Sequence, residues 1–138
     1  MEIKKFAGEL IVLLTLFNEA RKSAQGFHGR DASFEEFKKQ VDGEQIYIAT
    51  VDGNIVGFVS VWEKGNFIHH LYVDPKHQNR NIGSALIAKC KEIFGLPLSL
   101  KCIEENTGAC AFYEKNGWVL GERDTGPDGP YILYILKE

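Results

Sequence analysis

Residues 70–86 carry the clearest chemical signal in the sequence. They read as an apolar strand, a sharp exit at Asp74-Pro75, a polar loop and the start of a helix near Ile82. The first N–H groups of a helix lack intrahelical partners and share the positive end of the helix dipole, so they suit an anion such as a pyrophosphate. Gly83 has no side chain, which would let a phosphate approach the backbone closely. The stretch therefore predicts an anion site at the start of this helix.

Two other phosphate-binding motifs are absent. The sequence has no G-x-x-x-x-G-K-[ST] pattern, which excludes a P-loop, and no G-x-G-x-x-G pattern, which excludes a dinucleotide fingerprint. A polar connection between a strand and a helix is also an ordinary structural feature. The loop therefore needs a second motif before it indicates a particular ligand.

The rest of the chain alternates between strand and helix patterns. The expected order is a strand at 2–6, helices at about 9–23 and 34–41, strands at 45–51, 55–62 and 67–73, a helix at 82–93, a strand at 98–103, a helix at 107–115, and strands at 118–122 and 131–136. Ser33, with Glu36 three residues later, is the expected N-cap of the second helix. Residues 67–103 should form a parallel strand-helix-strand unit with a right-handed crossover, and the chemistry should lie at its carboxyl end.

Length and composition favour one domain over residues 1–138. Of the 138 residues, 44% are hydrophobic and 12% aromatic, which is enough for one continuous core. The net charge of −3 argues against nucleic acid as a partner.

The cysteines and the first apolar run exclude further classes. Cys90, Cys102 and Cys110 are odd in number and lack a C-x-x-C spacing, so we expect neither a disulfide framework nor a zinc site, and a reducing cytoplasm fits best. Residues 10–17 are too few to cross a bilayer, which needs roughly 20, and no small-x-small cleavage site follows them. We expect a buried helix there and no membrane partner.

The polar loop resembles the pyrophosphate loop of the GNAT superfamily of N-acetyltransferases. That loop reads Q/R-x-x-G-x-G/A and follows a strand that ends in L-x-V-x-P. Here the strand ends in Leu71-Tyr72-Val73-Asp74-Pro75, and the loop reads Gln78-Asn79-Arg80-Asn81-Ile82-Gly83. Asn81 replaces the usual glycine. Asparagine is the side chain that best tolerates a positive φ, so we expect the loop to close in the same way.

A second GNAT pattern, N-x-x-A-x-x-F-Y followed by G-F, lies at the expected distance. It is matched by Asn106, Ala109, Phe112, Tyr113 and Gly117-Trp118. The order of elements is also that of the family, so the resemblance covers nearly the whole chain. It implies an α/β (mixed α+β) fold, with a mixed, mostly antiparallel sheet of about six to seven strands, about four flanking helices and a central β-α-β unit for acetyl-CoA.

The resemblance also implies a set of cofactor-binding residues, with acetyl-CoA as cosubstrate and no metal. The backbone of Leu71, Tyr72 and Val73 would bind the pantetheine arm, and one of its N–H groups would polarise the thioester carbonyl. Asn106 would hydrogen-bond the arm or act only as an N-cap, and Phe112 would pack beside the arm or in the core. The pyrophosphate would lie against Gln78, Asn79, Arg80, Asn81, Ile82, Gly83 and Ser84.

Tyr113 and His69 are the expected catalytic residues. The resemblance gives Tyr113 the role of general acid, which protonates the thiolate of coenzyme A as it leaves, and a core tyrosine is the alternative. An amine with a pKa of about 10.4 arrives protonated, so a base or a water relay must remove a proton. His69 stands where related enzymes often have a carboxylate, and an imidazole accepts a proton near pH 7. His70 and Glu63 remain alternatives, as does a histidine without a catalytic role.

The implied activity is transfer of an acetyl group from acetyl-CoA to a primary amine, by direct attack in a ternary complex. Cys102 and Cys110 show no activating base, so no covalent acyl-enzyme is expected. A non-catalytic acyl-CoA-binding sensor or regulatory module is the alternative. The family commonly forms dimers, which makes a homodimer a further expectation.

The amine acceptor itself is left open between small molecules and protein amines. We expect it to contact the loop at 26–31, the strand near Trp62 and the turn at 124–130. Phe27, Trp62 and Tyr131 would line an aromatic pocket there, or else belong to the core or its rim.

Overall fold

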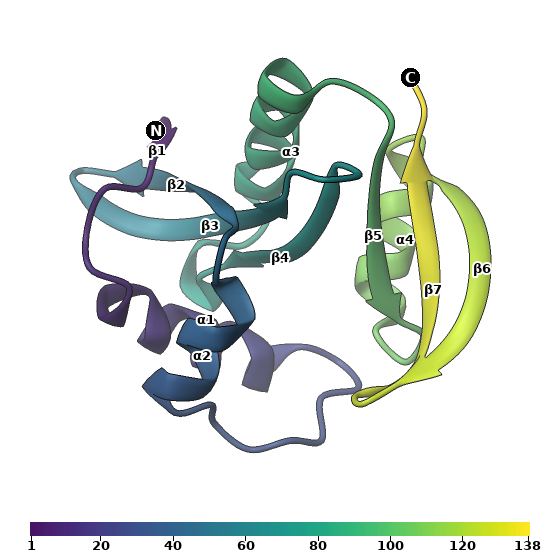
Figure 1. Ribbon diagram of the computed structural model, residues 1–138, viewed down its shortest axis with the longest axis horizontal. Coiled ribbons are helices and arrows are strands. Elements are labelled where there is room, and N and C mark those ends of the chain that lie inside the picture. Colours follow the sequence, from purple (N-terminus) through teal and green to yellow (C-terminus); the bar gives the residue numbers. More distant parts are fainter.

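The computed structural model describes residues 1–138 and contains one seven-stranded sheet and four α-helices (Figure 1). The strands are β1 (Glu2–Lys5), β2 (Gln45–Val51), β3 (Asn54–Trp62), β4 (Phe67–Val73), β5 (Leu98–Ile103), β6 (Val119–Gly126) and β7 (Gly129–Leu136). The helices are α1 (Ile11–Ser23), α2 (Phe34–Val41), α3 (Ile82–Phe94) and α4 (Thr107–Lys115). The strand order is β1-β2-β3-β4-β5-β7-β6, and only β4 and β5 pair in parallel. The predicted mixed, mostly antiparallel fold is confirmed.

Helices cover both faces of the sheet. In Figure 1, α3 lies above strands β2 to β4, and α1 and α2 lie below them. On the lower face Leu13 and Phe17 of α1 belong to one apolar cluster with Phe58 of β3. On the upper face Leu86 of α3 packs in a second, larger cluster with Val59 of β3. The sheet is therefore buried on both sides at its centre, which fits its continuous apolar strands.

Pairing between β4 and β5 ends early. Only Phe67 with Ser99 and Ile68 with Leu100 are paired, although both strands continue for several residues. β4 keeps its antiparallel partner β3 up to Val73, and β5 keeps β7 up to Ile103. The sheet thus opens between its two halves toward the carboxyl ends of β4 and β5.

Gly57 of β3 lets α3 pack closely on the sheet. A Cβ at this position would lie 3.2 Å from Cγ2 of Ile82 and 3.1 Å from the carbonyl oxygen of Tyr72. Ile82 is the first residue of α3, so the missing side chain brings the start of the helix against the end of β4. This close approach fixes the position of the loop between β4 and α3.

Two local signals in the sequence are confirmed. Ser33 and Glu36 form the predicted capping box, in which each backbone N–H donates to the other side chain, at 3.0 and 3.2 Å. The apolar run 10–17 is a helix whose Leu13, Leu16 and Phe17 are buried. No helix of the structure has the length and apolar character that a bilayer crossing requires.

The last hairpin differs from the expectation. Its strands reach Gly126 and begin again at Gly129, so the predicted long turn at 124–130 is reduced to Pro127 and Asp128. Proline fixes the φ of the first turn residue, and Gly129 takes a φ of 106° that other residues rarely adopt. The cluster of turn residues indicated a loop, but only two of them form the turn and the others continue the strands.

Candidate active site

An open cleft of about 1180 Å³ lies where β4 and β5 separate. Its walls come from β4, the loop before α3, β5, α4, the loop after α1 and the turn between β6 and β7. The predicted site residues that line it are His69, Leu71, Tyr72, Val73, Gln78, Asn79, Asn81, Ile82, Gly83, Ser84, Asn106, Phe112 and Tyr113. Arg80 is exposed and lies outside this lining. The cleft brings the two sequence motifs together in one place.

The loop before α3 takes the conformation that its sequence suggested. Asn79 and Asn81 have φ values of 65° and 62°, in the left-handed region where asparagine is among the few tolerated side chains. The Asp74 side chain accepts a hydrogen bond from the Lys76 N–H at 3.0 Å and shapes the exit from β4. Asn81 precedes the helix without capping it by its side chain. The first N–H groups of α3 therefore remain available to a ligand.

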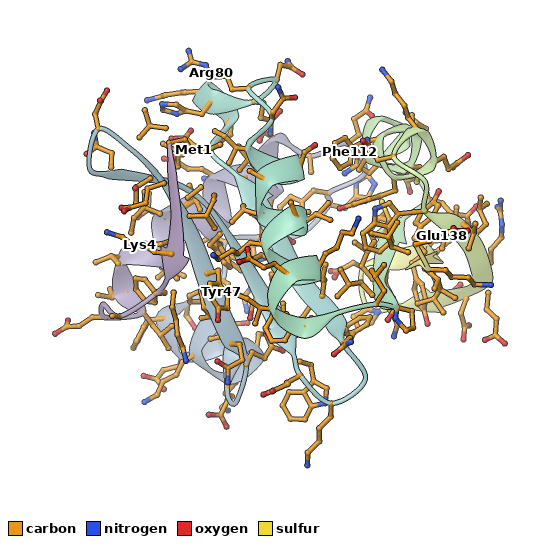
Figure 2. The ribbon with its side chains drawn as sticks, turned by 90° about the horizontal axis from the view of Figure 1, so that it is seen from above. Met1, Lys4, Tyr47, Arg80, Phe112 and Glu138 are labelled. Carbon is orange, nitrogen blue, oxygen red and sulfur yellow. The ribbon has the colours of Figure 1, made fainter.

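Gly83 and Phe112 face each other across the cleft. A Cβ on Gly83 would meet only Cζ of Phe112 and Cγ2 of Val73, each at 4.0 Å. Figure 2 shows Phe112 on α4, to the right of α3, and Arg80 on the loop that precedes α3, at the top of the view. The backbone of Gly83 is therefore open to the cleft, and Phe112 forms an apolar wall next to it.

Asn106 is the N-cap of α4. Its Oδ1 accepts a hydrogen bond from the Ala109 N–H at 3.2 Å, as the capping interpretation predicted. Gln25, in the loop after α1, accepts hydrogen bonds from the Gly108 N–H and the Thr107 hydroxyl, each at 3.1 Å. The amide nitrogen of Asn106 is not used in the cap, and the residue lines the cleft.

Tyr113 is a buried side chain whose ring packs against Phe112, Trp118 and Tyr134 at centroid distances of 5.3 to 5.7 Å. Burial raises the pKa of its phenol well above the ordinary value, and no hydrogen bond contributes to that shift. The hydroxyl is therefore protonated at neutral pH and free to donate. Tyr113 therefore belongs to the core cluster and also lines the cleft.

His69 is held by a carboxylate that the sequence did not indicate. Its Nδ1 lies 2.6 Å from Oε2 of Glu44, and the other Glu44 oxygen accepts a hydrogen bond from the Ser60 hydroxyl. The Glu44 side chain is 5% exposed and that of His69 is 37% exposed. Glu44 thus holds the ring of His69 through Nδ1, and His69 lines the cleft.

A β-bulge puts His69 and His70 on the same face of the sheet. Ser60 pairs with His70 and Val61 with Ile68, which leaves His69 as the extra residue of β4. The two imidazole rings stack at 3.9 Å instead of pointing to opposite faces. Glu44 could not be linked to them from sequence, since it lies 25 residues earlier.

The two alternative bases fit less well. His70 is 7% exposed and does not line the cleft. Its burial, reinforced by the neighbouring His69 and by Arg21, lowers its pKa to about 3, so the ring stays neutral and is a weak base. Glu63 is exposed after the end of β3, beside the β3–β4 turn, and also lies outside the cleft.

The cysteines do not form a nucleophilic centre. Cys102 and Cys110 are free and buried, with their sulfur atoms 3.7 Å apart. Burial, together with Cys110, raises the pKa of the Cys102 thiol far above its ordinary range. A protonated thiol is a poor nucleophile, which fits the expectation of direct transfer.

Glu44, His69 and His70 also bring potential metal-ligand atoms within 4.8 Å of one another. Glu44 and His69 are also joined by their hydrogen bond. The sequence did not indicate this cluster, because Glu44 comes from a segment 25 residues before the adjacent His69 and His70.

The acceptor side of the cleft differs in part from the expectation. Phe27 and the β6–β7 turn line it, but Trp62 and Tyr131 do not. Trp62 is 42% exposed outside the cleft. Phe27 thus fits the pocket interpretation, whereas Trp62 and Tyr131 fit the alternative that placed them outside such a pocket.

Comparison with known proteins identifies the family. The model of the acetyltransferase (GNAT) family matches residues 13–118, which include both motifs and most of the sheet. This chain belongs to the GNAT acetyltransferase family.

One curated relative is the peptidyl-lysine N-acetyltransferase YiaC of Escherichia coli, 34% identical over 74 residues that make up 54% of this chain and 49% of the relative. The chain spans less than half the length of the curated relatives it matches.

Two solved structures are similar. A GCN5-related N-acetyltransferase from Rhodopseudomonas palustris aligns with a TM-score of 0.79 and 21% identity, over 99% of this chain and 95% of the other. A putative streptothricin acetyltransferase from Bacillus anthracis, in complex with acetyl coenzyme A, aligns with a TM-score of 0.61 and 28% identity, over 74% of this chain and 68% of the other.

The loop geometry predicts how two substitutions affect acetyl-CoA binding. Asn81→Gly should keep or tighten binding, because glycine reaches a φ near 62° without the cost of a Cβ. Gly83→Val should weaken binding about tenfold or more, or about 1.4 kcal/mol, because its side chain occupies the approach of a phosphate. Isothermal titration calorimetry measures both, with Gly83→Ala as an intermediate. If valine at position 83 leaves the affinity unchanged, the pyrophosphate binds elsewhere.

Proposed function

We propose that this chain is an acetyl-CoA-dependent N-acetyltransferase that acts on a primary amine by direct attack in a ternary complex. One observation carries the proposal: the open helix start after Asn81 and the paired side chains of Glu44 and His69 line or border the same cleft. Family membership and the acetyl-CoA complex of the Bacillus anthracis relative support the cofactor.

In this proposal the cofactor is held mainly by backbone groups. The pyrophosphate binds the N–H groups at the start of α3, where the helix dipole favours an anion. The pantetheine arm lies along residues 71–73 of β4, which have no partner on β5. An N–H group of this edge donates to the thioester carbonyl and stabilises the oxyanion of the tetrahedral intermediate.

His69 serves as the base. The acceptor arrives as an ammonium with a pKa of about 10.4, and the free Nε2 of His69 takes its proton directly or through water. Glu44 positions the ring through Nδ1 and stabilises the imidazolium that forms. The amine nitrogen then attacks the carbonyl carbon and a C–N bond forms. As the intermediate collapses, the C–S bond breaks, and the proton that the nitrogen still has to lose passes through water to the thiolate, which leaves as the free thiol of coenzyme A.

Tyr113 assists the leaving group. The thiolate of coenzyme A departs with the electron pair of the C–S bond and needs a proton or a hydrogen-bond donor. The raised pKa of Tyr113 keeps its phenol protonated but makes complete loss of the proton less favourable. A hydrogen bond that strengthens as negative charge develops on sulfur is therefore the main part of its role.

The proposed location is the cytoplasm, because three free buried cysteines fit a reducing compartment. A homodimer remains a prediction from the family.

The proposed function has a direct test. Acetyl-CoA should raise the melting temperature, since a ligand at a hundredfold excess over Kd adds about 2.7 kcal/mol of stability. An amine panel should then release free thiol from acetyl-CoA in the presence of the protein. Absence of a thermal shift at millimolar acetyl-CoA would overturn the cofactor assignment. A shift without turnover on any amine would favour the acyl-CoA sensor.

Tyr113→Phe should preserve binding and slow the chemical step. The substitution removes only the hydroxyl and keeps the ring among Phe112, Trp118 and Tyr134. Removing one hydrogen-bond donor to a developing negative charge costs about 10²- to 10³-fold, so single-turnover rates should fall by about that factor while the Kd for acetyl-CoA changes little. An unchanged single-turnover rate would make Tyr113 a packing residue and leave water to protonate the thiolate.

His69→Gln should lower kcat about 10²- to 10⁴-fold at pH 7, with a loss that shrinks at high pH as the free amine becomes available. Glu44→Gln should cause a smaller loss and shift the pH profile of kcat/KM, because the amide no longer stabilises the imidazolium. Glu63→Gln, outside the cleft, serves as the matched control and should behave as wild type. Equal loss at every pH in His69→Gln would point to a structural role for the histidine.

A further inference from the structure

Arg21 stands out among the charged side chains of the cleft. It lies on the last turn of α1, is half-buried, and forms no ion pair. Arg30 and Arg123, in contrast, pair with Glu36 and Glu104. A half-buried guanidinium without an acidic partner is costly unless something else compensates its charge.

Two aromatic rings hold the guanidinium of Arg21. Its Cζ lies 4.7 Å from the ring centre of Phe17 and 4.8 Å from that of Phe27. Cation–π contacts engage the faces of the planar group and leave its N–H edge free. That edge can form two parallel hydrogen bonds to a carboxylate, which is the partner whose geometry it matches best. The rings therefore orient the arginine while its donors remain open.

Arg21 is on the acceptor side, away from the proposed phosphate site. It comes from α1, on the opposite face of the sheet from α3, whose start would hold the pyrophosphate (Figure 1). Phe17, which stacks on it, also contacts His70 and Tyr72 of β4, at 5.3 and 5.4 Å. The guanidinium thus lies beside the middle of β4, where the amine must meet the thioester.

The loop after α1 forms the wall of the cleft next to Arg21. Gln25 is hydrogen-bonded to the start of α4, and His28 lies 3.0 Å from a carboxylate oxygen of Glu105. Gly26 fits against Glu105 so closely that a Cβ would lie 2.6 Å from the Glu105 Cβ. These contacts tie the loop to the other half of the sheet, which favours a small acceptor over a folded protein.

An acidic side chain of the cleft suits the ammonium group of a zwitterion, while the exposed Lys101 and Lys115 add positive charge at the cleft surface. Asp128, on the β6–β7 turn, lines the same cleft and has no basic partner among the ion pairs. It provides a negative charge for an ammonium, while Arg21 provides a positive charge for a carboxylate. A free amino acid carries both groups within one small molecule.

We propose that the acceptor is a small amine that carries a carboxylate, of the amino-acid class, and that Arg21 binds this carboxylate. The inference rests on the proposed acetyl transfer and specifies its substrate. Arg21 acts in specificity: it places the acceptor so that the amine reaches His69 and the thioester, and it takes no part in proton transfer.

The experiment compares matched acceptors. The probes are free L-amino acids and their carboxamides, which keep the amine and lose the carboxylate charge. Hydrogen bonds to a charged group correspond to about 10- to 100-fold in affinity, so wild type should prefer the free acid in kcat/KM by that ratio. Arg21→Met should bring the ratio close to one, and Arg21→Lys should retain part of it.

Controls separate the possible failures. Arg123→Met, which changes an exposed arginine outside the cleft, should keep the wild-type ratio. The affinity of Arg21→Met for acetyl-CoA should match wild type, which also shows that the variant is folded. Equal use of acids and carboxamides by wild type, or activity only on peptide lysines or polyamines, would overturn the carboxylate inference and leave acetyl transfer standing. Turnover of no amine at all would overturn both proposals.

Discussion

The facing edges of β4 and β5 pair at only two positions, and the backbone groups beyond those positions have no sheet partner. Such groups cost free energy when buried without a hydrogen bond, so they must face water or a ligand. The surrounding sheet stays intact because β3 supports β4 and β7 supports β5. The fold therefore builds a cleft from two rigid walls, and a ligand with amide groups along its length can replace the missing strand contacts.

The start of α3 depends on the same separation. Gly57 allows the helix to approach the sheet, and Asn79 and Asn81 turn the loop through the left-handed region, so that the free N–H groups lie at the mouth of the cleft. Asparagine in this conformation bears a modest steric cost that glycine avoids. The packing of Ile82 and Leu86 into the core fixes the backbone that follows Asn81 and offsets this cost.

The sequence predicted the order of elements and the motif residues because both depend on local chemistry: periodicity, turn residues and short spacings. It did not predict the contact of Glu44 with His69, since that contact joins segments 25 residues apart and requires the register of β2, β3 and β4. The site around Arg21 was missed for the same reason: Phe17 lies one turn earlier on α1, but Phe27 reaches the guanidinium only when the loop after α1 folds back. The aromatic residues proposed for the acceptor pocket show a different limit: residue type alone does not tell where a side chain lies, and Trp62 and Tyr131 lie outside the cleft.

The extra residue in β4 explains why two adjacent histidines have different surroundings. In a regular strand their rings would point to opposite faces, with one packed under α3. The bulge turns both toward α1, where His70 packs beside Phe17 and stays neutral, while His69 stacks over it and reaches Glu44. The low pKa of the buried His70 ring keeps it neutral, so it places no positive charge beside His69. The inner ring thus supports the outer one, and only the outer one meets the cleft.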